Sequence, residues 1–128
     1  MEKRKYDLRD RAIKFSTAII QFSQQIFTTP ITLPLVAQLV KSATSVGANL
    51  CEADCAETKK DFIHKMGICN KEAKETIYWL HTIGNVLPDW KSKTEILLSE
   101  ATELQLILAA IIRTAKSNED KKAAVRRR

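Results

Sequence analysis

Apolar residues recur along the chain with the period of an α-helix in four separate segments. In the first segment, from about Leu8 to Thr28, apolar side chains are spaced alternately by four and three residues. This spacing places them on one side of a helix for about three heptads. They are Leu8, Ala12, Phe15, Ile19, Phe22 and Ile26. Ile13, Ile20 and Phe27 widen the stripe, which predicts contacts with more than one neighbouring helix.

Three further segments show the same period and are separated by residues that break helices. The second helix is expected from the N-cap Thr32 to about Ala56, and the third from near Thr58 to about Gly84. The fourth is expected from about Ser92 to Ala115. Pro30 lies in the first connection, Pro34 lies in the first turn of the second helix, and Pro88 lies in the last connection. The sequence therefore predicts four helices joined by short connections.

Short connections favour antiparallel neighbours, so the predicted fold is an all-α, up-down-up-down four-helix bundle. Composition agrees, because only three Gly and three Pro occur in 128 residues. A β-rich fold of this length needs many more turns. The length corresponds to one domain, which we place at residues 1–115. The apolar period is lost from Lys116, so residues 116–128 are predicted to be a basic, disordered tail.

The net charge of +6 is concentrated at the two ends of the chain. Residues 113–128 carry seven basic and two acidic side chains, and residues 1–14 carry six and three. Both ends of an antiparallel four-helix chain lie at the same end of the bundle, so they would form a basic pole that attracts polyanions. The candidate nucleic-acid-binding residues are Lys3, Arg4, Lys5, Arg9, Arg11, Lys121, Lys122, Arg126, Arg127 and Arg128. The alternative for the tail is a solvated terminus that aids solubility.

Three aromatic residues, Tyr78, Trp79 and Trp90, fall near the end of the third predicted helix. Aromatic side chains with basic neighbours can stack on single-stranded bases. They also serve, more commonly, as core residues or as anchors of a subunit interface. The pattern favours the core or interface interpretation.

Between the two basic ends, the sequence gives only weak signals of a metal site. Cys51 and Cys55 share a helix face, with His64 and Cys69 on the next helix, but no second ligand pair matches them. Structural thiols are therefore favoured over a metal site, and we expect no metal and no cofactor. Asp61 and His64 form the only acidic-x-x-His pair, whereas a di-iron bundle needs two such pairs with glutamate.

No nucleophile with an adjacent base and no glycine-rich phosphate loop is present, so we expect no enzymatic activity. Several polar residues fall within otherwise apolar helices. Buried carboxylates among them can act as acids or bases, but a structural polar network is favoured. The predicted network comprises Asn49, Glu52, Lys71, Glu72 and Glu75.

The chain is expected to be cytoplasmic and not associated with a membrane. The first fourteen residues are charged and lack the apolar stretch of a secretory signal. The longest apolar stretch, Leu104–Ile112, is too short to span a bilayer. Three cysteines, an odd count, agree with reduced thiols in the cytoplasm.

Several segments together resemble one bacterial family. Lys41–Ala53 reads KSATSVGANLCEA, Lys60-Asp61-Phe62 follows, and Asn70–Leu80 reads NKEAKETIYWL. With the opening Tyr6–Ala12, this pattern resembles the four-helix-bundle proteins encoded in intervening sequences of 23S ribosomal RNA genes, over about residues 6–114. The same family includes the accessory variability determinant protein of diversity-generating retroelements. One departure is Ala53-Asp54, where the family commonly has Glu-Gly at the end of its second helix.

The resemblance implies an antiparallel bundle that assembles into a homopentamer and has no known catalysis. For the retroelement members it implies a basic assembly that binds nucleic acid and a partner reverse transcriptase. We therefore expect an oligomeric accessory or scaffold protein that binds RNA or DNA. The alternative is a protein-interaction oligomer without affinity for nucleic acid.

Overall fold

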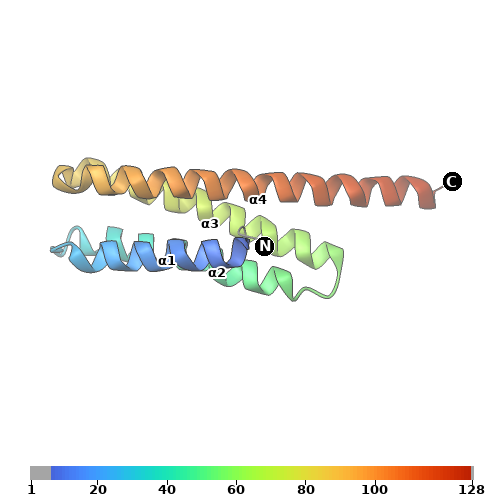
Figure 1. Ribbon diagram of the computed structural model, residues 1–128, viewed down its shortest axis with the longest axis horizontal. Coiled ribbons are helices and arrows are strands. Elements are labelled where there is room, and N and C mark those ends of the chain that lie inside the picture. Colours follow the sequence, from blue (N-terminus) through green and yellow to red (C-terminus); the bar gives the residue numbers. More distant parts are fainter. Residues whose placement is uncertain (1–6, 128) are drawn as a thin grey trace, which may run out of the picture.

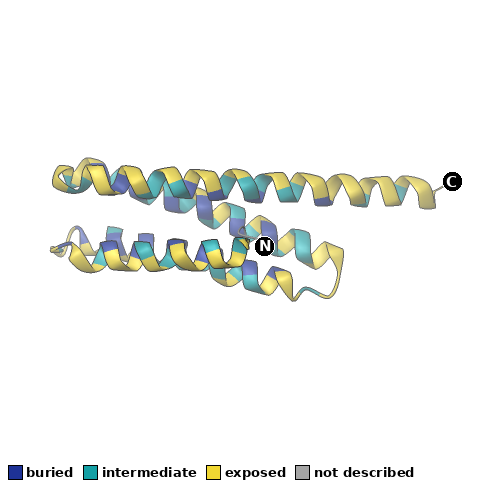
Figure 2. Ribbon diagram, in the orientation of Figure 1, coloured by how far each residue is buried: buried dark blue, intermediate teal, exposed yellow. Residues whose placement is uncertain are grey.

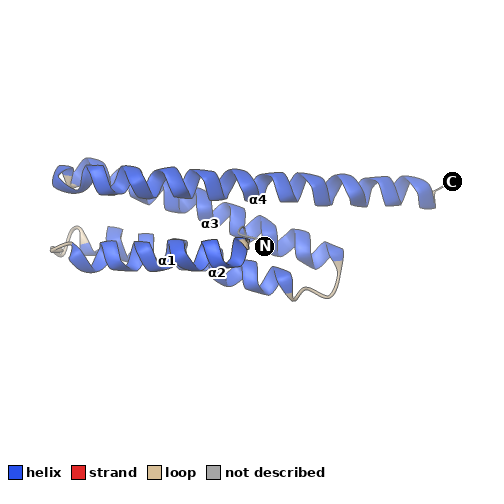
Figure 3. Cartoon of the chain, in the orientation of Figure 1, coloured by secondary structure: helices blue, strands red, loops and turns tan. Residues whose placement is uncertain are grey.

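The computed structural model describes residues 7–127, which form four long helices and one short 3-10 turn (Figures 1 and 3). The helices are α1 (Leu8–Gln25), α2 (Leu33–Asp54), α3 (Lys59–Val86) and α4 (Lys91–Arg126), with the turn η1 (Pro88–Trp90) before α4. The described part of the chain contains no strand, so the all-α prediction is confirmed. Lys3, Arg4, Lys5 and Arg128 lie outside the described residues.

Contacts between the helices define how the chain is arranged. Ser16 of α1 donates a hydrogen bond to the Ala43 carbonyl of α2, and Thr76 of α3 donates to the Ser42 hydroxyl. Gln105 of α4 donates to Asn70 of α3. Each helix packs against the next in the chain, and α1 also packs against α4 (Figure 1). The structure is therefore a helical bundle in which the first and last helices, α1 and α4, also contact each other.

The buried side chains form two clusters along the bundle (Figure 2). The larger cluster draws on all four helices and includes Phe15, Ile19, Leu39, Leu80 and Leu104. The second is built mainly by α2 and α3, and its other buried residues are Ala12 from α1 and Leu108 from α4. In the first helix Ala12, Phe15, Ile19, Phe22 and Ile26 are buried as their spacing predicted, and Leu8 is half-buried. The residues expected to widen this stripe, Ile13, Ile20 and Phe27, are exposed.

The helix ends follow from local hydrogen bonds. The Thr58 hydroxyl accepts from the backbone N–H of Asp61 at 3.0 Å, which is the N-cap half of a capping box. Thr32 occupies the N-cap position of α2, but its hydroxyl accepts from the N–H of Thr29 instead. The α1 helix ends at Gln25, earlier than expected, because Ile26 adopts extended backbone angles before the turn that contains Pro30.

The expected disordered tail is wrong for residues 116–126, which continue α4 without a break to Arg126. The loss of apolar periodicity at Lys116 marks where the helix leaves the bundle rather than where it ends (Figure 1). Ala, Lys, Arg and Glu have high helix propensity, and extending an existing helix avoids the cost of nucleation. The segment contains several of these residues and no Gly or Pro.

Gly84 marks a close approach of α3 to α4. A Cβ added there would lie 2.6 Å from the hydroxyl oxygen of buried Thr94, which donates to the Lys91 carbonyl. We therefore expect Gly84→Ala to destabilise the protein by about 1–3 kcal/mol, measured by urea unfolding. Gly67→Ala is the matched control, because its Cβ meets nothing within 4 Å and should stabilise α3 by up to about 1 kcal/mol.

The double variant Gly84→Ala/Thr94→Ala removes the opposing hydroxyl and should recover part of the loss. Equal stability of the two single glycine variants would contradict the close contact. Gly47 is not constrained in the same way, because a Cβ there would lie at an ordinary 3.7 Å from Ala12.

Candidate nucleic-acid interface

The end of α4 projects from the bundle as an exposed, positively charged helix (Figures 1 and 2). We refer to residues 116–127 as the C-terminal arm. At 1.5 Å per residue, the helical part of the arm, which ends at Arg126, extends about 16 Å beyond Ala115, the last buried residue among those described. Its basic side chains are all exposed: Lys116, Lys121, Lys122, Arg126 and Arg127. Glu119 and Asp120 are its acidic residues, which leaves a net charge of +3.

The face of α4 that is apolar and packs in the core becomes charged in the arm. Leu104, Leu108 and Ala115 are buried on that face within the bundle. Further along the same face, the spacing of an α-helix brings Glu119, Lys122 and Arg126 into these positions. Since charged side chains are costly to bury without partners, this face of the arm is suited to water or to a charged ligand.

Positive charge surrounds the arm rather than lying on one face. Adjacent residues in an α-helix point about 100° apart. Lys121 and Lys122 therefore project in different directions, and so do Arg126 and Arg127. An exposed helix with cations on several sides can contact more than one phosphate at the same time.

Arg9 and Arg11 occupy a different environment, because both face carboxylates of the bundle. Arg11 donates to both carboxylate oxygens of Glu100, at 2.8 and 2.9 Å, and also to Glu103. Arg9 lies 3.8 Å from Asp54. Hydrogen bonds to Glu100 and Glu103 raise the pKa of the Arg11 guanidinium above its usual value. Arg11 therefore links α1 to α4, and its charge is locally balanced.

The structure does not bring Arg11 together with the cations of the arm. Arg11 pairs with Glu103 of α4. Lys121 lies about 27 Å further along α4 than Glu103, at 1.5 Å per residue. The reason is that α1 begins at Leu8, beside the middle of α4, while α4 continues well past it (Figure 1). The expected single basic pole is thus replaced, within residues 7–127, by a separate cationic arm.

The residues expected to form one polar network have separate local partners. Glu52 accepts from Lys65 at 2.5 Å, and Glu75 accepts from the indole N–H of Trp79 at 3.1 Å. The Asn49 side chain donates to the Ser45 carbonyl one turn earlier. Glu72 accepts from Thr76 through its backbone carbonyl, and Lys71 is exposed. The buried polar link between α2 and α3 is instead the Ser42–Thr76 pair, at 2.9 Å.

The three aromatic residues do not form a stacking platform. Trp90 packs edge-on against buried Phe22, with ring centroids 5.8 Å apart. Tyr78 and Trp79 lie on α3, with ring centroids 4.9 Å apart, and Tyr78 is exposed. Trp79 and Trp90 are both half-buried and pack against the larger core cluster, which agrees with the core interpretation, and the arm contains no aromatic residue.

The cysteines are free thiols in different environments. Cys69 is fully buried, and burial raises the pKa of its thiol to about 12. Cys51 is half-buried and Cys55 is exposed. Among residues 7–127, no group of three or more His, Cys, Asp or Glu side chains is placed to hold a metal ion. Over the same range, no helix is both long and apolar enough to cross a bilayer.

The fold and the arm together define a class, namely small helical-bundle proteins that carry an extended cationic helix. The model of the 23S rRNA-intervening sequence protein family matches residues 4–110. Because this match covers most of the sequence, the chain belongs to that family, and the family named from the sequence motifs is confirmed. The arm lies beyond the matched residues.

One solved structure supports the same assignment. The chain is similar to a protein of unknown function from the S23 ribosomal protein family of Bacteroides thetaiotaomicron. The two are 31% identical with a TM-score of 0.71, and the match covers 82% of this chain and 97% of that one. No curated protein matches the chain.

Proposed function

We propose that this protein is a non-enzymatic accessory or scaffold factor that binds nucleic acid through the C-terminal arm. The observation that carries the proposal is the exposed end of α4, residues 116–126, which together with Arg127 presents cations on several sides. Lys121, Lys122, Arg126 and Arg127 are the main contacts, and Lys116 extends the set. Such contacts supply affinity for RNA or DNA that does not depend on sequence.

Residues outside the arm make a smaller contribution to this proposal. Lys3, Arg4, Lys5 and Arg128 add positive charge near the two ends of the sequence and complete the proposed set. Arg9 is exposed and only loosely paired, so it remains available to phosphate. Arg11 is held by two glutamates and contributes mainly to the packing of α1 on α4.

The proposed functional form is a homo-oligomer of antiparallel four-helix subunits, with five copies as the family resemblance implies. One arm binds weakly because it carries few cations. Several arms on one assembly raise the effective concentration of binding sites along a polyanion, which increases the overall affinity without new contacts. Exposed apolar side chains, among them Phe27 and Ile31, support self-association.

The proposed setting is the cytoplasm, beside an enzyme that acts on nucleic acid, such as a reverse transcriptase. Three free cysteines fit a reducing compartment. An accessory role requires only that the bundle binds the same RNA or DNA as the enzyme and needs no cofactor. The alternative, a protein-interaction oligomer, predicts no affinity for nucleic acid.

A salt series tests the proposal directly. The full-length protein is titrated into a labelled single-stranded RNA and a labelled DNA duplex at increasing salt concentrations. We expect micromolar binding at low salt, with log K falling linearly with log salt as counterions are released. The absence of binding to both ligands at low salt would overturn the proposal and leave the protein-interaction alternative.

A further inference from the structure

One end of the bundle carries a long stretch of sequence without charge. From Phe15 to Val40 there is no Asp, Glu, Lys or Arg, although charged residues make up 28% of the chain. This stretch contains most of α1, the α1–α2 connection and the start of α2. In Figure 1 the connection lies at the end of the molecule opposite the arm. Depletion of charge is typical of the centre of a protein–protein interface.

The same end exposes large apolar side chains. Phe27 is 88% exposed and Ile31 is 78% exposed, both in the α1–α2 connection. Leu33, at the start of α2, is more than half exposed. Isolated exposed apolar residues are common, but a group within a charge-free segment indicates a contact surface. We refer to residues 27–33 as the apolar loop.

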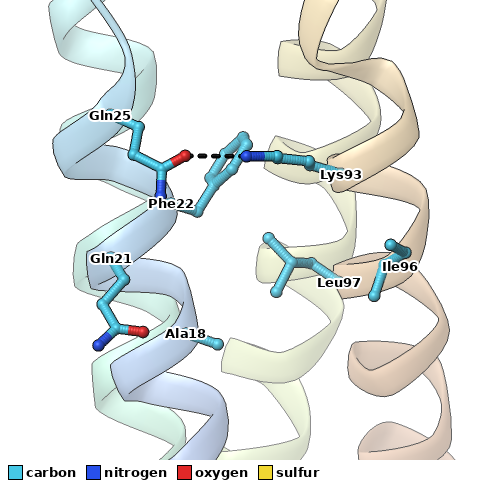
Figure 4. Close-up of a pocket in the computed structure, with 7 residues that line it drawn as sticks. All are labelled: Ala18, Gln21, Phe22, Gln25, Lys93, Ile96 and Leu97. Carbon is cyan, nitrogen blue, oxygen red and sulfur yellow. Dashed lines mark hydrogen bonds between the residues drawn. The ribbon is translucent and has the colours of Figure 1, made fainter.

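A groove between α1 and α4 opens near this end (Figure 4). It has a volume of about 220 Å³, and α1 and α4 both contribute to its walls. Its lining residues are Ala18, Gln21, Phe22, Gln25, Lys93, Ile96 and Leu97. Ile96 is 71% exposed at its edge. The groove is therefore mostly apolar and open to an incoming side chain.

Lys93 is the one charged residue in the lining of this groove. Its ammonium donates to the Gln25 side-chain oxygen at 3.0 Å (Figure 4). The ammonium also lies 5.2 Å from the centre of the Trp90 ring. These contacts hold the ammonium beside α1. Other surface grooves carry carboxylates, such as Glu95 and Glu103 between α3 and α4, or Asp54 beside the start of α1.

We propose that the apolar loop of one copy, with Phe27 at its centre, binds in the α1–α4 groove of a second copy of this chain. Charge favours a second copy as the partner. Each chain carries a net charge of +6, so two copies repel each other over most orientations. The loop and the groove bring together two surfaces that carry almost no charge, and this contact avoids the repulsion.

Because every copy offers one loop and one groove, each copy can bind one neighbour through its loop and another through its groove, which is a head-to-tail contact. Repetition of such a contact closes into a ring when the rotation between copies allows it. The arm projects from the opposite end of the molecule and stays free (Figure 1). The inference rests on the oligomeric part of the proposed function and supplies its contact. A bilayer is disfavoured as the partner, since the loop itself contains no cation for anionic lipids.

Disulfide trapping between two different chains tests the contact. The background carries Cys51→Ala and Cys55→Ser, while Cys69 is retained because its buried thiol is unreactive near neutral pH. One chain carries Phe27→Cys and the other Ile96→Cys; both positions are exposed, and circular dichroism verifies that each variant folds. Mild oxidation of the mixture should give a linked dimer that neither chain forms alone.

The matched control replaces Ile96→Cys with Val125→Cys, an equally accessible apolar position on the arm. It should give no link with the Phe27→Cys chain. A link that forms in the Phe27→Cys chain alone would overturn the groove as the receptor and indicate loop-to-loop contact. A link with the arm as efficient as with the groove would overturn the proposal as well.

Light scattering of the unmodified protein separates this inference from the proposed function. A monomer at micromolar concentration would contradict both the oligomeric part of the function and the contact, leaving the loop to a different protein or a membrane. An oligomer that lacks the 27–96 link would contradict only the contact. An oligomer that becomes monomeric in Phe27→Ser/Ile31→Ser, with its helical content unchanged, supports it.

Discussion

Replacing the four cations Lys121, Lys122, Arg126 and Arg127 with glutamine is expected to weaken nucleic-acid binding about 100-fold at low salt. Each phosphate contact contributes about 0.9 to the slope of log K against log salt for duplex DNA. Loss of four contacts should therefore reduce the slope by about 3.6. Glutamine keeps a high helix propensity, so the arm should remain helical. Fluorescence anisotropy across a salt series measures both quantities.

A matched control distinguishes the arm from the general positive charge of the protein. Lys14, Lys41, Lys71 and Lys74 are exposed lysines on α1, α2 and α3. Their replacement with glutamine changes the net charge by the same amount but leaves the arm intact. We expect this control to lose less than about tenfold in affinity, since it removes long-range attraction without removing contacts.

Two results would count against the arm as the binding element. If both quadruple variants lose affinity equally, the protein binds through its overall charge rather than through the arm. If neither variant loses affinity, the binding residues lie elsewhere, and Lys3, Arg4 and Lys5 become the next set to replace.

The core was predictable from the sequence because one physical rule governs it. Side chains spaced by three and four residues share a helix face, and burial of apolar surface selects that face. Phe15, Ile19 and Phe22 illustrate this, since their spacing placed them on one side of the first helix and each is at most 5% exposed. The same rule placed Ile13 and Ile20 beside the core, yet both remain exposed in the single chain.

The arm was not predictable from periodicity, because its helix is not held by apolar packing. Residues 116–126 stay helical through propensity and continuity with α4. The relevant signal was composition, namely several residues of high helix propensity without Gly or Pro. Lys116 was not among the candidate binding residues, and the arm exposes it beside the others.

The ion-pair partners of charged residues could not be predicted from the sequence either. Arg11 was counted toward a basic pole, but it pairs with Glu100 and Glu103 from the far part of the chain. Such pairing depends on the register of α1 against α4, which spacing within either helix does not determine. A charge count along the sequence therefore overstates the positive surface near the start of α1.

Leu39→Ala is expected to cause a large loss of stability, about 2–5 kcal/mol. Leu39 is fully buried and belongs to the larger cluster, which joins all four helices. Truncation removes buried apolar atoms and leaves a cavity that surrounding helices fill only in part. A domain of this size has a total stability of about 5–15 kcal/mol, so this change removes a substantial share of it.

Urea unfolding at a fixed protein concentration measures the effect, because self-association makes apparent stability depend on concentration. Leu106→Ala is the matched control: the same atoms are removed from a side chain of α4 that is mostly exposed, and the expected loss is within about 0.5 kcal/mol. Equal losses at the two positions would contradict the placement of Leu39 in the core. A much larger loss at Leu106 would instead show that this exposed leucine is buried in the assembly.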